Sequence, residues 1–311
     1  MSKALGAQLV ELEHRGSKGL RYLILSLKTM RLIIHEKPDC LIVQNPSIVL
    51  ALLAGIIGKI LHQYTVIDAH NAGIFPLEGR SSFLNILSRM INSLADMVIV
   101  SNENLQKYLK KSGINAVAIP DPIPTLQPRQ VYKIPHDRFA VVFICTWATD
   151  EPYKEVIKAA EHLDESFIIY VTGNVKRTNG DIRDNLPDNI ELTGYLSEED
   201  YESLLASCDV AMALTTRDDC LLCGAYEGVA AGKPLILSDK PALKNYFNSG
   251  AVFTENKSAM IANSIIECRE KYEILSREIA LFKESNVKRM QGLIQDLDTI
   301  LLNQKSRRLE M

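Results

Sequence analysis

The chain is 311 residues long, 47% of its residues are hydrophobic and 23% are charged, and its formal net charge at pH 7 is −3. This length accommodates two ordinary globular domains, and the negative charge excludes the strongly basic domain that nucleic-acid binding requires. Six dispersed cysteines argue against a disulfide scaffold, and the longest apolar run, 48–57, is too short for a bilayer span, so we expect a reduced, cytoplasmic protein.

The first part of the chain alternates short apolar runs with longer amphipathic segments. The apolar runs predict strands at 8–11, 40–44, 65–68, 97–101 and 116–119. The segments between them predict helices at 19–35, 47–61, 82–94 and 103–111. Continuously apolar strands are typical of a parallel sheet that is covered on both faces. We therefore predict an α/β, doubly wound, Rossmann-like domain over residues 1–125.

Prolines then cluster between Pro120 and Pro135. Proline neither continues a helix nor donates to a central strand ladder, so 126–138 is predicted to be a linker. The alternation resumes with strands at 140–145, 167–172, 190–192, 210–214, 235–237 and 252–253. Helices are predicted at 153–163, 198–207, 224–231, 242–247 and 257–308. This pattern predicts a second Rossmann-like domain over 139–275, with a helical tail over 276–311.

The segment from Leu214 to Asp239 carries the most specific pattern. A strand is followed by a polar loop and by a short helix that begins near Leu222 and ends before Gly232. The amino end of such a helix suits a diphosphate, because its backbone N–H groups and dipole face the anion. Arg217 in the loop is a candidate bidentate phosphate ligand, and Glu227 in the helix is a candidate ribose ligand.

This segment resembles the C-terminal domain of the family-4 retaining glycosyltransferases, the glycosyl transferases group 1. Their signature has a first Glu, seven intervening residues and a second Glu in a short helix, followed by Ala-x-Gly-x-Pro and a strand. Glu227 matches the second Glu, and Gly232-Lys-Pro matches the sequence that follows it. Asp219 stands eight positions before Glu227, in place of the first Glu. The resemblance implies that Asp219 contacts the donor sugar.

Two further loops are similar to those of the dolichol-linked β-1,4-mannosyltransferases. The loop after Phe143, with Asp150 and Glu151, is similar to their Thr-Ser-Trp-Thr-x-Asp-Glu, and 66–73 is similar to their Ile-Asp-x-His-Asn-x-Gly. The second match implies that His70 lies near the reacting carbon, although spacing alone favours a capping or surface histidine. The stretches 171–174 and 189–197 fit the nucleotide-base edge of a donor pocket. The donor-binding candidates are then Thr146, Trp147, Gly173, Asn174, Tyr195, Arg217, Cys220, Gly224 and Glu227.

Several of these residues have simpler interpretations. Asp150 and Glu151 suit the amino end of the helix predicted at 153–163, and we favour a capping role for Glu151 while leaving Asp150 open. Cys220 and Cys223 form one pair only, so we expect packing and not a metal site. The helix with Lys18, Arg21, Lys28 and Arg31 among leucines is most simply a solvated face, and a peripheral contact with the inner membrane face is the alternative.

The resemblance implies a GT-B fold whose two Rossmann-like domains face a cleft. The Gly-rich loop and first strand that usually open this fold are not visible, so we expect the acceptor-side domain to be truncated or built differently. We predict a metal-independent hexosyltransferase without a cofactor, using a mannose- or glucose-type nucleotide sugar and a glycan or lipid-linked acceptor. A nucleotide-sugar 2-epimerase and a non-catalytic donor-binding subunit are the alternatives, and retention or inversion stays open.

Overall fold

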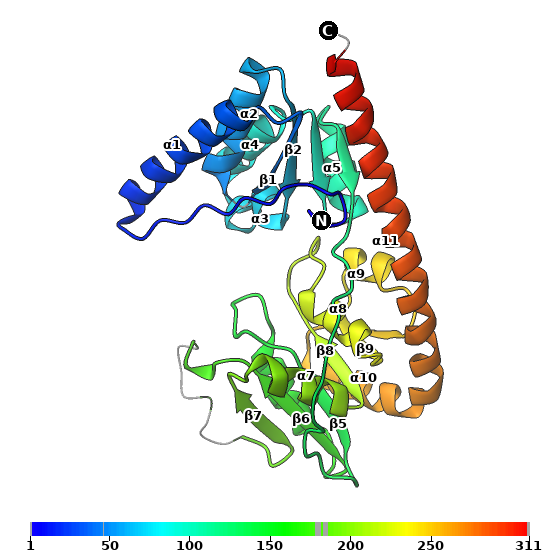
Figure 1. The fold of residues 1–311 in the computed structure, drawn as a ribbon. Coiled ribbons are helices and arrows are strands. Elements are labelled where there is room, and N and C mark those ends of the chain that lie inside the picture. Colours follow the sequence, from blue (N-terminus) through cyan, green and yellow to red (C-terminus); the bar gives the residue numbers. More distant parts are fainter. Residues whose placement is uncertain (1, 46, 178–181, 183–185, 310–311) are drawn as a thin grey trace. The chain divides into compact units, whose positions relative to one another are not determined.

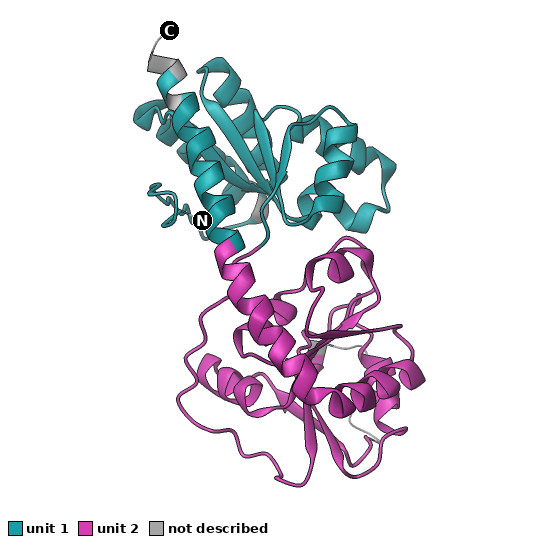
Figure 2. Ribbon diagram, turned by 90° about the vertical axis from the view of Figure 1, so that its right-hand side faces the viewer, with its two compact units in different colours: residues 1–120, 289–311 teal, residues 121–288 magenta. Residues whose placement is uncertain are grey.

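The computed structural model describes residues 2–45, 47–177, 182 and 186–309 (Figure 1). The chain divides into two compact units, each built on one parallel sheet (Figure 2). Unit 1 comprises residues 1–120 and 289–311, and unit 2 comprises residues 121–288. The predicted α/β class with two Rossmann-like sheets is confirmed. Within the described residues, no helix is both long enough and apolar enough to cross a lipid bilayer.

Unit 1 contains a four-stranded sheet in the order β1-β2-β3-β4, with every neighbouring pair parallel. Its strands are β1 (Cys40–Asn45), β2 (Tyr64–Ala69), β3 (Met97–Val100) and β4 (Ala116–Ala118). Its helices are α1 (Lys18–Glu36), α2 (Ile48–Ile60), α3 (Asn71–Ile74), α4 (Ser82–Asn92) and α5 (Glu103–Lys111), with a 3-10 turn at Pro76–Gly79.

Both faces of this sheet are covered, as its continuously apolar strands require. One face packs against α2, α4 and α5. The other face packs against Met290 and Leu297 of the last helix of the chain, α11 (Tyr272–Leu309). Three of the covering helices begin with a residue whose side chain accepts a hydrogen bond from the first turn. These N-caps are Ser47, Ser81 and Asn102.

The strand predicted at 8–11 is wrong. This segment forms no strand, and its apolar side chains remain in solvent, with Leu9 exposed to 67% and Val10 to 44%. An apolar run becomes a strand only when it pairs with a neighbour and packs on one face, and residues 8–11 do neither. The first strand of the observed sheet is β1, which lies at its edge.

Unit 2 contains a six-stranded sheet in the order β10-β9-β8-β5-β6-β7, which is also parallel throughout. Its strands are β5 (Phe139–Phe143), β6 (Phe167–Thr172), β7 (Ile190–Gly194), β8 (Val210–Ala213), β9 (Leu235–Ser238) and β10 (Ala251–Thr254). Its helices are α6 (Tyr153–Ala160), α7 (Glu198–Ser207), α8 (Cys223–Ala230), α9 (Pro241–Tyr246), α10 (Ser258–Glu270) and the first part of α11, with a 3-10 turn at Val175–Arg177.

The order of the strands in unit 2 creates a topological switch point. From β5 the chain proceeds to β6 and β7 on one side, and then returns to add β8, β9 and β10 on the other. The connections that leave the carboxyl ends of β5 and β8 therefore diverge, and the crevice between them is where open α/β sheets bind ligands. Helices α7, α8 and α9 cover one face of the sheet, and α6 and α10 cover the other.

The helical tail predicted from residue 257 is two helices, α10 and α11, which meet at Lys271. Figure 2 shows that α11 belongs to both units, because its residues up to Lys288 are part of unit 2 and those from Arg289 are part of unit 1. The observed division of the chain thus adds the end of α11 to the amino-terminal sheet.

Candidate functional site

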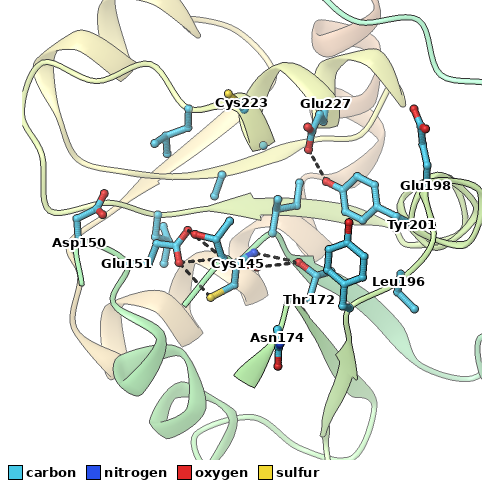
Figure 3. Close-up of a pocket in the computed structure, with 18 residues that line it drawn as sticks. Cys145, Asp150, Glu151, Thr172, Asn174, Leu196, Glu198, Tyr201, Cys223 and Glu227 are labelled. Carbon is cyan, nitrogen blue, oxygen red and sulfur yellow. Dashed lines mark hydrogen bonds between the residues drawn. The ribbon is translucent and has the colours of Figure 1, made fainter. Parts of the chain in front are cut away.

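A pocket of about 560 Å³ lies at the switch point of unit 2 (Figure 3). Its wall consists of the turns that follow β5, β6, β7 and β8 and of the amino end of α8. All of these segments follow the carboxyl ends of parallel strands, which explains why residues far apart in the sequence converge there.

The amino end of α8 forms one side of this pocket. The helix begins at Cys223, after Leu222 in an extended conformation, and Gly224 is its second residue. A Cβ at Gly224 would lie 2.9 Å from the side chain of Ile144, so glycine allows the first turn to pack closely on the end of β5. The first turn thus presents its backbone to the pocket, as an anion site requires.

Glu227 lies on the next turn of α8 and also lines the pocket. The Tyr201 hydroxyl, from α7, donates a hydrogen bond to Glu227 Oε2 (Figure 3). Burial, followed by the negative charge of Glu227, raises the pKa of Tyr201, so the hydroxyl stays protonated and keeps donating. The carboxylate is thereby held by one oxygen, and the contact orients it at the pocket wall.

The turn after β5 is organised by Glu151. Its carboxylate accepts hydrogen bonds from the backbone N–H of Thr146 (2.9 Å) and of Ala148 (2.8 Å), and from the Thr146 hydroxyl (3.0 Å). The expected capping role of Glu151 is wrong, because α6 follows Pro152 with no side-chain cap. The carboxylate instead folds back on its own turn, where several donors already converge.

This turn also fixes the single tryptophan of the chain, Trp147. Its backbone has a positive φ of 63°, and its side chain is only 5% exposed and stacks on Tyr153 with ring centroids 5.2 Å apart. The side chain is part of the core beneath the pocket and does not line it. Trp147, predicted as a donor-binding residue, therefore lies in the core next to the pocket and outside its described lining.

Asp150 connects the turn after β5 with the loop after β8. It accepts a hydrogen bond from the Thr215 hydroxyl at 2.9 Å and forms an ion pair with Arg217 Nη2 at 3.2 Å. Its side chain is 12% exposed and that of Arg217 is 39% exposed. Arg217 is not a wall residue of the pocket, and its guanidinium reaches the site through the pocket residue Asp150.

The turns after β6 and β7 form the opposite side. Gly173 has a φ of +87°, and a Cβ there would lie 2.2 Å from the carbonyl oxygen of Cys145, so only glycine fits. Asn174 follows it and accepts a hydrogen bond from the backbone N–H of Lys176 at 3.1 Å. Tyr195 is 88% exposed at the rim. An exposed aromatic ring beside polar groups is a suitable surface for a planar base.

The structure brings together six of the predicted residues as pocket lining and leaves the others outside it. The six are Thr146, Gly173, Asn174, Tyr195, Gly224 and Glu227. Asp219 and Cys220 lie in the loop between β8 and α8 without lining the pocket. His70 lies in unit 1, exposed at the carboxyl end of β2, where its backbone N–H donates to the Asn45 carbonyl at 2.9 Å.

Tyr201 and Glu198 were not predicted as site residues. Both lie on α7, and Tyr201 comes just before the buried pair Leu204 and Leu205, so its spacing indicated an ordinary core position. A tyrosine three residues from a buried leucine carries no signal of its own. Only the distant Glu227 gives it a role, and that pairing depends on the packing of α7 against α8.

The described residues that line the pocket include four acidic side chains and no lysine, arginine or histidine. The charge of Glu151 is balanced by N–H donors and that of Asp150 by Arg217. An anion in this pocket would therefore depend on the backbone N–H groups of α8 and on the Asp150–Arg217 pair. Among the described residues, no group of three or more His, Cys, Asp or Glu is placed to hold a metal ion.

Comparison with solved structures finds proteins of similar fold. HepE from Anabaena, solved in complex with UDP-glucose, superposes with a TM-score of 0.68 at 16% identity, covering 90% of this chain and 82% of that chain. Sucrose-phosphate synthase from Thermosynechococcus elongatus gives a TM-score of 0.67 at 17% identity, over 97% and 82%. A glycosyltransferase from Rickettsia africae gives 0.71 at 12% identity, over 96% and 86%.

A search of curated protein sequences finds no match to the chain. The model of the family described as glycosyl transferases group 1 matches residues 126–280. This range begins in the proline-rich segment and contains every pocket-lining residue. The similarity to the glycosyl transferases group 1 therefore covers the part of the chain that contains the pocket, and the chain has the two-sheet α/β fold of the GT-B proteins.

Proposed function

We propose that the protein transfers a hexose, of the mannose or glucose type, from a nucleoside diphosphate sugar to an acceptor, and that the pocket of unit 2 holds the donor. The observation that carries this proposal is the position of Glu227. Its carboxylate, oriented by Tyr201, lines a pocket that also contains the amino end of α8. A carboxylate for ribose hydroxyls beside a helix end for phosphates is the arrangement that a nucleoside diphosphate requires.

The three parts of the donor match three parts of the pocket. The base is proposed to lie against Tyr195 and Asn174, where an exposed ring and an amide are available. The ribose hydroxyls bind Glu227, and the diphosphate binds the N–H groups of Cys223 and Gly224. Arg217 neutralises the charge of Asp150 and so reduces the repulsion between this carboxylate and the phosphates. This order runs from the turns of β6 and β7 to the first turn of α8.

The chemical step requires stabilisation of the leaving diphosphate. Backbone N–H groups and a guanidinium supply that stabilisation when they are fixed in place before the reaction, so we propose that no metal ion or cofactor is needed. Asp219, in the loop between β8 and α8, is proposed to contact the donor sugar, and His70 is proposed to act near the reacting carbon. Both roles rest on the resemblance of their loops to those of known transferases.

The acceptor is proposed to be a glycan or a lipid-linked glycan, bound by unit 1. This part of the proposal is supported by the basic and leucine-rich helix α1, whose segment from Lys18 to Arg31 is proposed to contact a membrane surface from its cytoplasmic side. The Lys18 side chain lies outside the described side chains, so the argument rests on Arg21, Lys28 and Arg31.

The test is calorimetric titration of the full chain with UDP and with GDP. Replacing Glu227 by Ala removes a charge-assisted hydrogen bond of about 1.5–3 kcal/mol, which corresponds to at least tenfold weaker binding. Glu165→Ala is the matched control, because this carboxylate is exposed between α6 and β6 and does not line the pocket. Equal affinity of the Glu227→Ala variant and the wild type would remove Glu227 from the site and withdraw the donor assignment.

A second assay separates transfer from epimerisation. The protein is incubated with the nucleotide sugar that the titration identifies, first without and then with candidate acceptors. A transferase gives slow hydrolysis without an acceptor and a new glycoside with one. Formation of an epimer of the donor without an acceptor would instead establish the 2-epimerase alternative. Binding without any turnover would establish a non-catalytic donor-binding subunit.

A further inference from the structure

Three consecutive long helices of unit 1 each expose a stripe of large apolar side chains. On α1 the stripe contains Leu20, Leu23 and Leu27, of which Leu23 is 59% exposed. On α2 it contains Val49, Leu52, Ile56 and Ile60, with Ile60 67% exposed. On α4 it contains Phe83, Ile86 and Met90, with Phe83 72% exposed.

The spacing within each stripe is three or four residues, so each stripe lies along one side of its helix. The buried residues Ile33 of α1, Ala54 of α2 and Ile91 of α4 lie off the stripes, on other sides of their helices. Each helix therefore exposes a row of apolar side chains in addition to the residues that it buries, which an ordinary surface helix does not. Packing within unit 1 explains the buried residues of these helices but not the exposed apolar stripes.

The three stripes belong to neighbouring helices. Helix α2 packs against both α1 and α4, so the three helices are neighbours with α2 in the middle (Figure 1). We call the outer sides of α1, α2 and α4 the apolar-basic surface. Single exposed leucines are common on soluble proteins, but a set that extends over three adjacent helices marks an interaction site.

The charges on these helices are almost all positive. Arg21, Lys28 and Arg31 on α1, Lys59 on α2 and Arg89 on α4 are basic, and Glu36 is the acidic residue in the same three helices. The whole chain, in contrast, has a net charge of −3. Positive charge is therefore concentrated where the apolar side chains are exposed.

We propose that the apolar-basic surface binds a bilayer that contains anionic phospholipids. Leucine, isoleucine and phenylalanine side chains enter the boundary between head groups and acyl chains, and lysine and arginine contact the lipid phosphates. A second copy of the chain fits this surface poorly. A symmetric dimer places the same patch against itself, so the basic residues of both copies would face one another with little acidic charge to compensate.

This inference extends the membrane contact proposed for α1, and its test is independent of donor chemistry. The full-length protein is sedimented with vesicles of phosphatidylcholine alone and with vesicles of equal parts phosphatidylcholine and phosphatidylglycerol. We expect binding to the second kind and little to the first. Sedimentation with neither, or with both equally, would overturn the proposal.

Variants then test which part of the surface binds. Leu27→Glu and Ile56→Glu change exposed stripe residues, and each is expected to weaken vesicle binding at least tenfold. Lys28→Gln with Arg31→Gln should weaken it about fivefold per charge removed. Leu281→Glu is the matched control, because Leu281 is 67% exposed on α11 in unit 2, and it should bind like the wild type.

Circular dichroism and the UDP or GDP titration establish that each variant is folded. A stripe variant that keeps full vesicle binding would refute the proposal, as would loss of binding in the Leu281→Glu control. If sedimentation velocity shows a dimer that the stripe variants dissociate, the surface binds a second copy instead. If the protein binds UDP or GDP but does not bind vesicles, this inference is rejected and the proposed transferase function stands.

Discussion

Replacing Glu151 by Gln tests whether one carboxylate holds the turn after β5. The side chain keeps its shape and loses one acceptor oxygen together with its charge. The backbone N–H groups of Thr146 and Ala148 both donate to Glu151 Oε2, at 2.9 and 2.8 Å, so an amide oxygen in its place keeps both bonds but without the negative charge that strengthens them. The NH₂ group then takes the place of Oε1, which accepts hydrogen bonds from the Thr146 hydroxyl at 3.0 Å and from the Thr146 N–H at 3.1 Å, and these two contacts are lost.

The magnitude follows from these contacts. A hydrogen bond to a charged acceptor contributes about 1.5–3 kcal/mol, and the bonds of Thr146 count for less because they are exposed to water. We therefore expect the free energy of unfolding of unit 2 to fall by about 2–3 kcal/mol. With a urea m-value of about 2–3 kcal/mol/M, the midpoint of unfolding should fall by roughly 1 M.

The chain contains its own reporter for this experiment. Trp147 is the single tryptophan and is buried in the same turn, so its fluorescence follows the unfolding of this region in urea. Glu165→Gln serves as the control, because this side chain is exposed outside the pocket and should leave the midpoint unchanged. A Glu151→Gln variant with the wild-type midpoint would show that the conformation of the turn does not depend on the carboxylate.

Three further predictions concern the rest of the pocket. Cys223 is an exposed residue at the start of α8, and partial burial of its thiol, followed by the charges of Asp121 and Glu227, raises the pKa of this thiol. Iodoacetamide should therefore alkylate Cys223 more slowly than an ordinary exposed thiol at the same pH, and bound UDP or GDP should block the reaction, as peptide mass spectrometry will show. Tyr201→Phe removes the hydrogen bond that orients Glu227 and should weaken nucleotide binding about tenfold in calorimetry, whereas unchanged affinity would deny it a positioning role. Gly173→Ala, whose Cβ would lie 2.2 Å from a backbone oxygen, should lower the free energy of unfolding by about 2–5 kcal/mol. Gly194→Ala, at a φ of +70° with open space around it, should lower it by only about 1–2 kcal/mol, and equal urea midpoints of the two variants would contradict this prediction.

Most of the fold could be predicted from the sequence because burial and periodicity agree along it. The prediction at 103–111 matches α5 residue for residue, since Asn102 caps the helix and Leu105 and Leu109 form its buried side. The strand at 167–172 matches β6, all of whose residues are buried. Both elements are determined by residues close together in the sequence and by packing against a single hydrophobic core. Residues 8–11 contain apolar residues like those of a strand, but they have no partner strand. Sequence patterns do not reveal whether a partner strand is available.

The site was predictable only in part. Glu227 and Gly224 were found because a helix start after a buried strand has a recognisable pattern. The functions of Glu151 and Trp147 were not, because both depend on a turn with a positive φ that folds back on itself. A carboxylate just before a helix predicts a cap by default. The choice between a cap and a turn is decided by three-dimensional contacts within a few ångströms.

The shared helix α11 has a consequence for biosynthesis. Residues from Arg289 onward are made last, yet Met290 and Leu297 cover Val66, Met97 and other core residues of the sheet that is made first. During translation, one apolar face of the amino-terminal sheet therefore stays exposed to solvent while residues 121–288 are synthesised and fold. The earliest-made lobe is thus the last to mature, and it is the nascent segment that most needs chaperone protection.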